Sequence, residues 1–400
     1  MSSPNADNGA GLVNGLISGF YKTATGLAPD RIAEREFGVG NFDVKISQRH
    51  MSFRNEHDLR GYLSANAIPY VSSSSAYYKF PTGRPMERKG WMGSELVFDL
   101  DVTDMDLPCQ IKHGKSWVCS VCLEEIKKET IKLVYDFLVA DFGFSEKEID
   151  VNFSGNRGYH VHVKNKDVLM LDAAARKQVT EYISGVGIDF DKFFMQTSNI
   201  WDKETYNMKK MKMVTGPNPK EKGWGGKIAR NFISSLDAGP SALERMDIDA
   251  ETAKKLYRNK ILIERGIGAG SWDFGRGISV KKMVEMCRKM VQNQAIVQSD
   301  RIDRNVTNDP THLLRLPNSI HGGTGLIARK LAAPKELYRF DPLSEGIAFR
   351  KGFVKINANT GYELRMAGQK FGPYAGEIKV PTYVGVYLYL RGLAKIINFI

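Results

Sequence analysis

The stretch Glu95–Asp101 reads ELVFDLD, and the regular alternation of its side chains makes it the part of the chain from which the fold can be worked out. In a β-strand, successive side chains point to opposite faces. One face would carry the apolar residues Leu96, Phe98 and Leu100. The other would carry Glu95, Val97, Asp99 and Asp101. The pattern predicts a strand packed on a core by its first face, with two carboxylates, Asp99 and Asp101, about 7 Å apart on the second.

Two carboxylates on a rigid strand can share one or two Mg²⁺ ions, which keep several waters and take their other ligands from substrate phosphates. Asp104 and Asp106 follow closely and add acidic density. By itself an Asp-x-Asp pair also fits a solvated strand end, so the pair gains weight only from what surrounds it.

The next segment holds three of the four cysteines of the chain, in the pattern Cys109-x3-His113-x5-Cys119-x2-Cys122. Thiolates and an imidazole at such spacing suit tetrahedral zinc. Four protein ligands leave no open position for water, so this zinc would be structural. The alternative, unrelated thiols, does not account for a histidine inside so short a cluster. Cys287, alone in a helical pattern, is expected in the core.

Residues 151–163 predict two strands joined by a glycine-containing turn, Gly155-Asn-Arg-Gly158. Glycines let the backbone approach a ligand closely, and Arg157 offers a bidentate fork for phosphate. His160 would share a strand face with His162. An ordinary hairpin with a solvated arginine fits the same local pattern. A fourth group lies further on, comprising Asp303, Arg315 and His321.

The coarse organisation is an α/β core interrupted by a helical insert. We expect a mobile tail over 1–25, a core of mixed sheet over 26–163 and 299–400 with the zinc knuckle at 109–122, and a mostly helical insertion over 164–298. Helical patterns cover 123–142, 172–183 and 280–292, with a flexible basic loop at 215–227. Strands are expected at 312–316, 320–327, 353–356 and 377–390.

The composition of the chain limits the kinds of partner that it is expected to bind. The 400 residues carry a net charge of +12, which attracts polyanions, nucleic acid first. An anionic membrane surface fits less well, because no amphipathic basic helix or lipidation signal stands out. No segment reads as a membrane span, and the apolar stretch 383–400 is interrupted by Arg391 and Lys395. Clustered cysteines suit a metal in a reducing compartment, which predicts an intracellular protein.

Taken in order, ELVFDLDVTD, the Cys/His cluster, a helix, SGNRGYHVHV, and Asp303 ahead of HLLRLPNSIH resemble the small subunit of DNA primases of the archaeo-eukaryotic primase family. The matching segments cover most of 38–331. The resemblance is closer to archaeal members, because His113 stands among the zinc ligands and because of the segment Ser75-Ala-Tyr-Tyr-Lys79.

That resemblance implies roles for particular residues. Asp99, Asp101 and Asp303 would form the catalytic triad that holds Mg²⁺ or Mn²⁺. The nucleotide-binding residues would be Arg49, Ser154, Arg157, His160, Arg315 and His321. The zinc ligands would be Cys109, His113, Cys119 and Cys122. It further implies template-directed synthesis of short RNA primers, with DNA primers also open, on single-stranded DNA from nucleoside triphosphates, by two-metal nucleotidyl transfer at the start of replication. The partner would be a primase large subunit. The protein would be located in an archaeal cytoplasm.

Two other functions remain open at this stage. The first is a related primase-polymerase acting in repair or damage tolerance, which would start and extend long chains without any partner. The second is a non-catalytic zinc protein that binds nucleic acid, whose carboxylates would be dispensable. A nucleotide hydrolase is disfavoured because the sequence has no Gly-x4-Gly-Lys-Ser/Thr phosphate loop.

Overall fold

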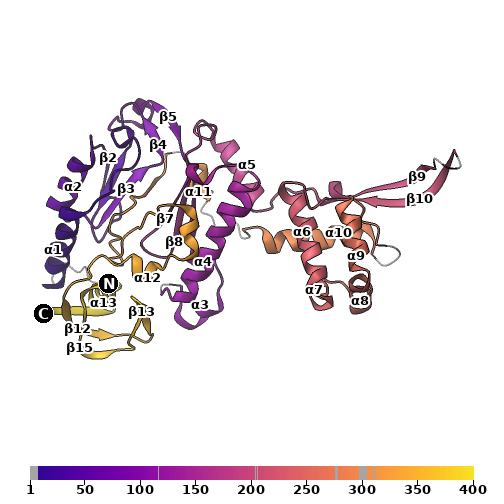
Figure 1. The fold of residues 1–400 in the computed structure, drawn as a ribbon. Coiled ribbons are helices and arrows are strands. Elements are labelled where there is room, and N and C mark those ends of the chain that lie inside the picture. The colour runs from indigo at the N-terminus through magenta and orange to yellow at the C-terminus, as the bar shows by residue number, and fades with distance from the viewer. Residues whose placement is uncertain are drawn as a thin grey trace. The chain divides into compact units, whose positions relative to one another are not determined.

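A computed structural model describes residues 8–115, 117–202, 204, 206–274, 278–296, 304–309 and 311–400. The chain divides into two compact units (Figure 1). Unit 1 comprises Met1–Val134, Phe144–Thr180 and Gln298–Ile400, and unit 2 comprises Tyr135–Gly143 and Glu181–Val297. The division differs from the expected insertion over 164–298 at two places. Unit 1 extends through Thr180, and unit 2 includes a short segment, Tyr135–Gly143, that lies before the expected insertion.

The predicted strand at 95–101 is confirmed as β6 (Leu96–Asp101), in an antiparallel sheet of order β6-β8-β7. The predicted hairpin supplies the other strands, β7 (Ile149–Phe153) and β8 (Gly158–Val163). One face of this sheet is built of apolar rows in register, such as Phe98, Val161 and Val151. The helix α4 (Ser120–Lys132) contacts β6 and β8. The other face carries the polar rows.

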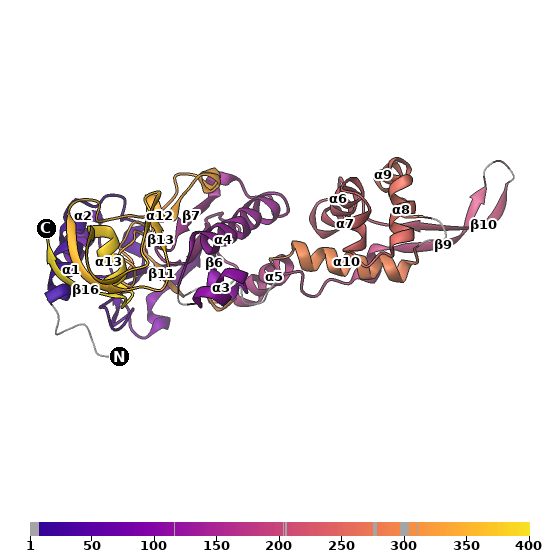
Figure 2. The same cartoon turned by 90° about the horizontal axis from the view of Figure 1, so that it is seen from below.

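A second antiparallel sheet has the order β11-β3-β1-β2. Its strands are β1 (Phe37–Gly40), β2 (Gln48–Met51), β3 (Tyr70–Ser74) and β11 (Leu313–Arg315). Helices α1 (Asn8–Thr23) and α2 (Glu56–Ala65) lie outside this sheet, and α4 lies outside the first one (Figures 1 and 2). Unit 1 is therefore layered as helices, sheet, sheet, helix. The strand β11 brings the C-terminal part of the chain beside the N-terminal strands.

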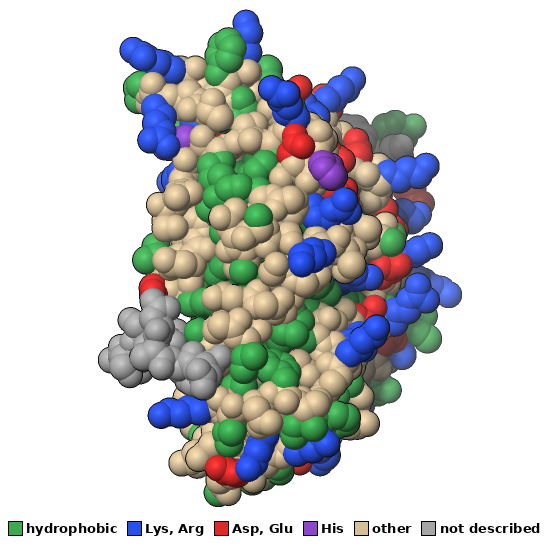
Figure 3. All heavy atoms as spheres, turned by 90° about the vertical axis from the view of Figure 1, so that its left-hand side faces the viewer, with side chains coloured by type: hydrophobic (Ala, Val, Ile, Leu, Met, Phe, Trp, Pro, Cys, Tyr) green, Lys and Arg blue, Asp and Glu red, His purple; other side chains and the backbone are tan. Residues whose placement is uncertain are grey.

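The predicted mobile tail over 1–25 is wrong for Asn8–Thr23, which form helix α1. Val13, Ile17 and Tyr21 are fully buried, at a spacing of four residues that makes one helix face. The Tyr21 hydroxyl oxygen accepts a hydrogen bond of 3.2 Å from the Ile320 backbone N–H. Figure 3 views the side that carries α1 and α2. Hydrophobic side chains are scattered over the middle of this face, and many Lys and Arg side chains lie along its right-hand edge.

The C-terminal region differs from the prediction at 377–390. The strand β15 (Ala375–Pro381) is followed by helix α13 (Thr382–Leu390), whose Val384, Val386 and Leu388 are buried. A helix that is apolar all round has no periodicity by which to distinguish it from a buried strand. Strand β15 pairs with β12 (Phe353–Asn359), which also pairs with β16 (Ala394–Phe399).

Unit 1 contains further α-helices and β-strands. They are β4 (Ala76–Tyr78), β5 (Trp91–Ser94), α3 (Pro108–His113), α5 (Ala173–Ile183, which runs into unit 2), α11 (Arg304–Asn308), α12 (Pro342–Glu345), β13 (Leu364–Met366) and β14 (Gln369–Phe371). Helix α4 ends earlier than the predicted 142, because the chain continues as a π-helical stretch, Leu133–Val139.

Unit 2 is mostly helical, with one element that the sequence reading missed. This is the two-stranded ribbon of β9 (Met195–Asp202) and β10 (Asn207–Thr215), which extends beyond the helices of the unit (Figure 1). The helices are α6 (Gly223–Asp237), α7 (Pro240–Glu244), α8 (Ala250–Arg258), α9 (Lys260–Gly268) and α10 (Val280–Gln294). The predicted loop at 215–227 is wrong from Gly223 onward, where α6 begins and buries Trp224. Among the described residues, no helix is both long and apolar enough to cross a membrane.

Candidate active site and zinc site

The two carboxylates of β6 lie on the polar face of their sheet, opposite residues of the predicted turn hairpin. Asp99 pairs with His160, and Asp101 pairs with Gly158. Their side chains are 29% and 30% exposed. The Asp101 Oδ1 accepts hydrogen bonds from the Thr103 N–H at 2.8 Å and hydroxyl at 2.7 Å, which fix its orientation. Two solvent-accessible carboxylates on one strand face are a suitable ligand set for a hard divalent cation.

The turn between β7 and β8 holds Arg157 next to these carboxylates. Ser154 organises the turn, because its Oγ accepts hydrogen bonds from the backbone N–H groups of Asn156 at 3.3 Å and Gly158 at 3.2 Å. A Cβ at Gly158 would lie 1.8 Å from the Leu100 carbonyl oxygen, so only glycine allows this approach to β6. The Arg157 Nη2 lies 3.3 Å from the Asp101 Oδ2. The turn thereby places a cation beside an acid.

Two histidines of the site are buried and held neutral. Burial, with His162 and Arg315 nearby, lowers the pKa of His160 to about 3, and its Nε2 lies 3.5 Å from the Asp99 Oδ1. The pKa of His321 lies well below its usual value, first because of burial and then because of surrounding cations. These cations are Arg315, Arg391, Lys45 and Arg157. Four cations around one imidazole make a place where an anion would be stabilised.

The orientation of His321 follows from its backbone surroundings. Its Nδ1 accepts a hydrogen bond of 3.2 Å from the Gly323 N–H, so the proton of the neutral ring is on Nε2. The Thr324 hydroxyl donates to the Gly155 carbonyl oxygen at 2.6 Å. A Cβ at Gly155 would lie 2.8 Å from the Cβ of His321. The imidazole and the β7–β8 turn are therefore packed directly against each other.

Arg315 comes to the site from the other sheet. Its guanidinium lies 4.7 Å from the centre of the Tyr70 ring, and the ring centres of Tyr70 and His321 lie 5.5 Å apart in a T-shaped arrangement. Burial lowers the pKa of Arg315 to about 10, so the side chain stays charged at neutral pH. Tyr70 thus positions a buried cation and a buried imidazole together.

The structure brings together seven of the nine residues predicted for catalysis and nucleotide binding. They are Asp99, Asp101, Ser154, Arg157, His160, Arg315 and His321. Arg49 lies on β2, at the opposite edge of its sheet from Arg315, and donates to Glu36 at 3.1 Å. Asp303 lies outside the described residues. The helix α11 begins directly after it, and the Thr307 hydroxyl donates to the Val97 carbonyl oxygen of β6 at 2.7 Å.

Sequence reasoning missed two cations of the site, Lys45 and Arg391, both of which lower the pKa of His321. The Arg391 Nη2 donates to the Asn156 Oδ1 of the turn at 2.8 Å. Neither residue belongs to a motif, and each lies far along the chain from the segments that it meets. Their only signal in the sequence was the excess of positive charge.

Below the carboxylates, the same sheet face carries a buried network around Glu95. The Glu95 carboxylate accepts from the Arg35 Nη2 at 2.5 Å and the Tyr77 hydroxyl at 2.7 Å, and its Oε2 lies 2.8 Å from the His162 Nδ1. Glu95 is 2% exposed and Arg35 is 3% exposed. Burial alone would raise the pKa of Glu95, but Arg35 and His162 outweigh it and lower the pKa below its usual range.

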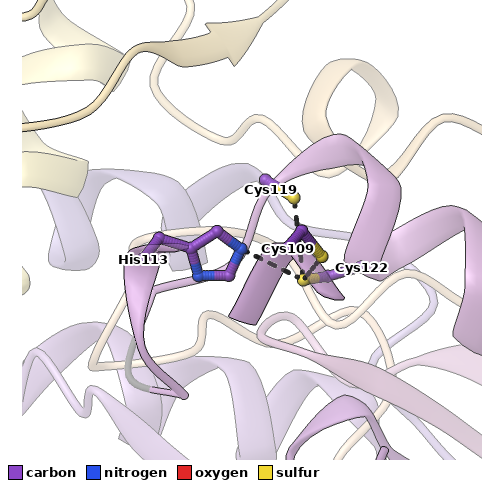
Figure 4. A group of neighbouring side chains, drawn as sticks. All are labelled: Cys109, His113, Cys119 and Cys122. Atoms are coloured by element: carbon purple, nitrogen blue, oxygen red, sulfur yellow. Dashed lines mark hydrogen bonds between the residues drawn. The ribbon is translucent and has the colours of Figure 1, made fainter. Parts of the chain in front are cut away.

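The predicted zinc ligands meet in one place, where their ligand atoms all lie within 4.8 Å of one another (Figure 4). Cys109 and His113 come from α3, and Cys119 and Cys122 come from the start of α4. The Cys122 Sγ lies 3.4 Å from the Cys109 Sγ and 3.5 Å from the His113 Nε2. Such mutual distances match the edges of a tetrahedron around a zinc ion.

The surroundings of the cluster also fit zinc. The His113 Nδ1 lies 2.7 Å from the Gly114 carbonyl oxygen, a contact that leaves Nε2 free for the metal, as is usual for ligating histidines. Burial raises the pKa of the Cys122 thiol to about 12. A bound cation would stabilise the thiolate and offset this. Because all four positions are protein ligands, the site is suited to a structural ion.

Comparison with known proteins identifies the family. Residues 98–333 match the family model of the DNA primase small subunit. The chain is 33% identical over 404 aligned positions to the DNA primase small subunit PriS of Methanosarcina mazei, with 94% of each chain covered. It is 32% identical to the PriS of Methanococcoides burtonii (94% of this chain and 95% of the relative) and 30% identical to that of Picrophilus torridus (95% and 96%). The carboxylates Asp99 and Asp101, the turn and the imidazole of His321 all fall within the matched segment, and the chain belongs to the DNA primase small subunit family.

Proposed function

We propose that this chain is the catalytic subunit of a DNA primase, which synthesises short RNA primers on single-stranded DNA during the initiation of replication. One observation carries the proposal. Two partly exposed carboxylates, Asp99 and Asp101, lie beside a turn that is packed against His321, an imidazole surrounded by four cations. Nucleotidyl transfer from a nucleoside triphosphate needs this combination of a cation-binding edge and an anion-binding edge.

In this proposal Asp99 and Asp101, completed by Asp303, would hold Mg²⁺ or Mn²⁺. Such a cation would supply Lewis-acid activation of the attacking 3′-hydroxyl and charge stabilisation at the pyrophosphate leaving group. Arg157 and Arg315 bind the oxygens of the incoming triphosphate. Ser154 keeps the turn in the conformation that presents Arg157. Most of the catalysis would come from positioning the triphosphate and from electrostatic stabilisation, and both require rigid side chains.

The neutral state of the two histidines has a chemical use in this scheme. Because its Nδ1 is occupied by the Gly323 N–H, His321 would donate a hydrogen bond from Nε2 to a phosphate oxygen. His160 lies against Asp99, and it would likewise orient its neighbour by hydrogen bonding rather than by charge. Arg49 remains a proposed contact of the nucleotide, although its present partner is Glu36.

Further parts of the proposal follow from family membership. The Cys/His cluster would bind zinc for structure, and a primase large subunit would be the partner that assists initiation. The template would be held chiefly through phosphate contacts, consistent with the net charge of +12. We also propose an intracellular location, in keeping with the clustered thiols.

The test is de novo synthesis on single-stranded DNA with labelled ribonucleotides or deoxyribonucleotides, in Mg²⁺ or Mn²⁺. Wild type should make short products, and the double variant Asp99→Ala/Asp101→Ala should make none while it still binds DNA. Long products without any partner would favour the related repair polymerase. Absence of products in every arm, including those with a preformed primer and with added large subunit, would favour a non-catalytic binding protein.

A further inference from the structure

A cavity of about 230 Å³ lies between the zinc knuckle and the C-terminal sheet of unit 1. The knuckle contributes His113 and Trp117, and the C-terminal region contributes Tyr362, Arg391 and Leu393. The lining, which also includes Thr360 and Gly361, thus comes from two distant parts of the sequence. The cavity is smaller than the roughly 300–1,000 Å³ typical of small-molecule sites, a size that suits one flat ring system better than a whole nucleoside triphosphate.

The aromatic wall of this cavity is rigid. The ring centres of Trp117 and Tyr362 lie 6.1 Å apart, and the His113 ring packs edge-on to Tyr362 at 6.3 Å. Tyr362 is 44% exposed, yet its hydroxyl is fixed by donating to the Lys112 carbonyl oxygen at 2.8 Å. An exposed but immobilised aromatic ring is the kind of surface on which nucleobases stack, because the ring has little conformational freedom left to lose.

The cationic wall connects the cavity to the candidate active site. The Arg391 guanidinium lies 5.3 Å from the centre of the Tyr387 ring and donates to the Asn156 Oδ1 at 2.8 Å. Asn156 directly precedes Arg157 in the turn, and Arg391 is among the cations that lower the pKa of His321. A ligand in the cavity would therefore lie beside the turn that we assign to the incoming triphosphate.

We propose that this cavity holds one nucleobase of the single-stranded DNA template, stacked on Tyr362, with Arg391 on the adjoining phosphate. The inference rests on the proposed function and adds a template subsite to it. The cavity wall offers one cation, Arg391, which matches the single charge of a phosphodiester. A free triphosphate, with several charges, would call for more. The knuckle would then have a second use, which is to supply one wall of the subsite.

The first experiment measures binding of a fluorescent oligo(dT) to the full chain by anisotropy, without divalent cations. Tyr362→Leu keeps apolar bulk but removes the stacking ring, and it should weaken binding about 10-fold to 100-fold. Tyr362→Phe keeps the ring and should restore most of the affinity. Tyr338→Leu removes another tyrosine, 62% exposed and not part of the cavity wall, and should bind as wild type does.

A second measurement isolates the arginine. Arg391→Gln should reduce the slope of log affinity against log salt by about 0.7, the value for one phosphate contact on a single strand. Asn156→Ala removes the partner of Arg391 but keeps the cation, and it should retain the wild-type slope. An unchanged slope in Arg391→Gln would overturn the phosphate assignment.

Two further results would overturn the template assignment. One is normal oligo(dT) binding by Tyr362→Leu with a raised KM for the first nucleotide, which would mark a free-nucleotide subsite. The other is weakened binding only to a primed template, which would mark the primer strand. A different measurement tests the proposed function itself. Failure of that function would appear as synthesis that survives in Asp99→Ala/Asp101→Ala, a result independent of how Tyr362 variants bind DNA.

Discussion

The two ends of strand β6 carry the same kind of side chain on the same sheet face, but in opposite environments. Glu95, just before the strand, is 2% exposed and is bound by Arg35, Tyr77 and His162. Asp99 and Asp101, at the far end, are about a third exposed and lie beside His160 and Arg157, respectively. The difference shows that burial and partners, not residue type, separate an acid that stabilises the fold from acids that are open to a cation.

The largest expected effect would be seen at the exposed end. Asp101→Asn keeps an oxygen that can accept the Thr103 hydrogen bonds but removes the charge that a divalent cation requires. We expect primer synthesis to fall by at least about 1000-fold with an unchanged melting temperature. The control is Asp106→Asn, an acid with a 76% exposed side chain that pairs only with Lys115 among the contacts of the described chain. Synthesis at the wild-type rate in Asp101→Asn would contradict the distinction between the exposed and the buried end of β6.

The Cys/His cluster, which we propose to be a zinc site, supplies the next largest effect, on stability rather than on activity alone. Cys122→Ser removes the sulfur that lies 3.4 Å from the Cys109 Sγ and 3.5 Å from the His113 Nε2. Because structural zinc contributes folding free energy directly, we expect loss of bound zinc and a melting temperature lower by about 10 °C or more. Metal content and thermal unfolding are measured on the same preparations. Cys287→Ser, at the buried cysteine outside the cluster, should keep a full complement of zinc.

At the buried end of β6, Glu95→Gln leaves Arg35 charged and without its carboxylate. Breaking a buried pair in this way costs about 3–5 kcal/mol of the free energy of unfolding. The exposed pair Glu34–Arg31 offers a matched control, because Glu34→Gln should cost no more than about 1 kcal/mol. Denaturant unfolding of both variants gives the two values. Equal losses would show that burial does not distinguish these acids.

The same variant makes a prediction about pH. The pKa of Glu95 is lower in the folded than in the unfolded state, where it is about 4.5. Its contribution to stability is therefore fully present above pH 4.5 and is lost as the pH falls through the lower, folded pKa. The difference in unfolding free energy between wild type and Glu95→Gln should shrink as the pH falls below 4.5. A difference that grows on acidification would contradict the assigned ion pair.

Much of this architecture was predictable where the sequence signal is local. The period of two in residues 95–101, the glycine turn after Phe153 and the Cys/His spacing each follow from neighbouring residues. Helix α1 was not predicted, because Gly, Asn and Ser residues separate the apolar positions Val13, Ile17 and Tyr21 and make their helical spacing hard to recognise. Helix α13 was predicted as a strand because its residues are apolar on every side.

The site itself could be predicted only in part, because some of its contacts join residues far apart in the sequence. The acid partner of Arg49 is Glu36, on another segment, and no residue near Arg49 in the sequence predicts that pair. Arg391 meets Asn156 across more than 200 residues, a contact that no spacing rule describes. Motifs located the carboxylates and the turn, whereas the ring of cations required the folded chain.

The smallest predicted effect tests how closely the turn and the imidazole are packed. Gly155 has φ +79°, where a side chain is strained, and its Cβ would lie 2.8 Å from the Cβ of His321. Gly155→Ala should cost about 1–2 kcal/mol of stability, and displacing His321 should raise the KM for the nucleotide more than it lowers kcat. Gly143→Ala is the control, because Gly143 also has positive φ, +77°, but no atom within 4 Å of the added Cβ. Both variants bear backbone strain, so an effect on KM in the first alone would assign it to the contact with His321. Equal effects on KM would separate His321 from nucleotide binding.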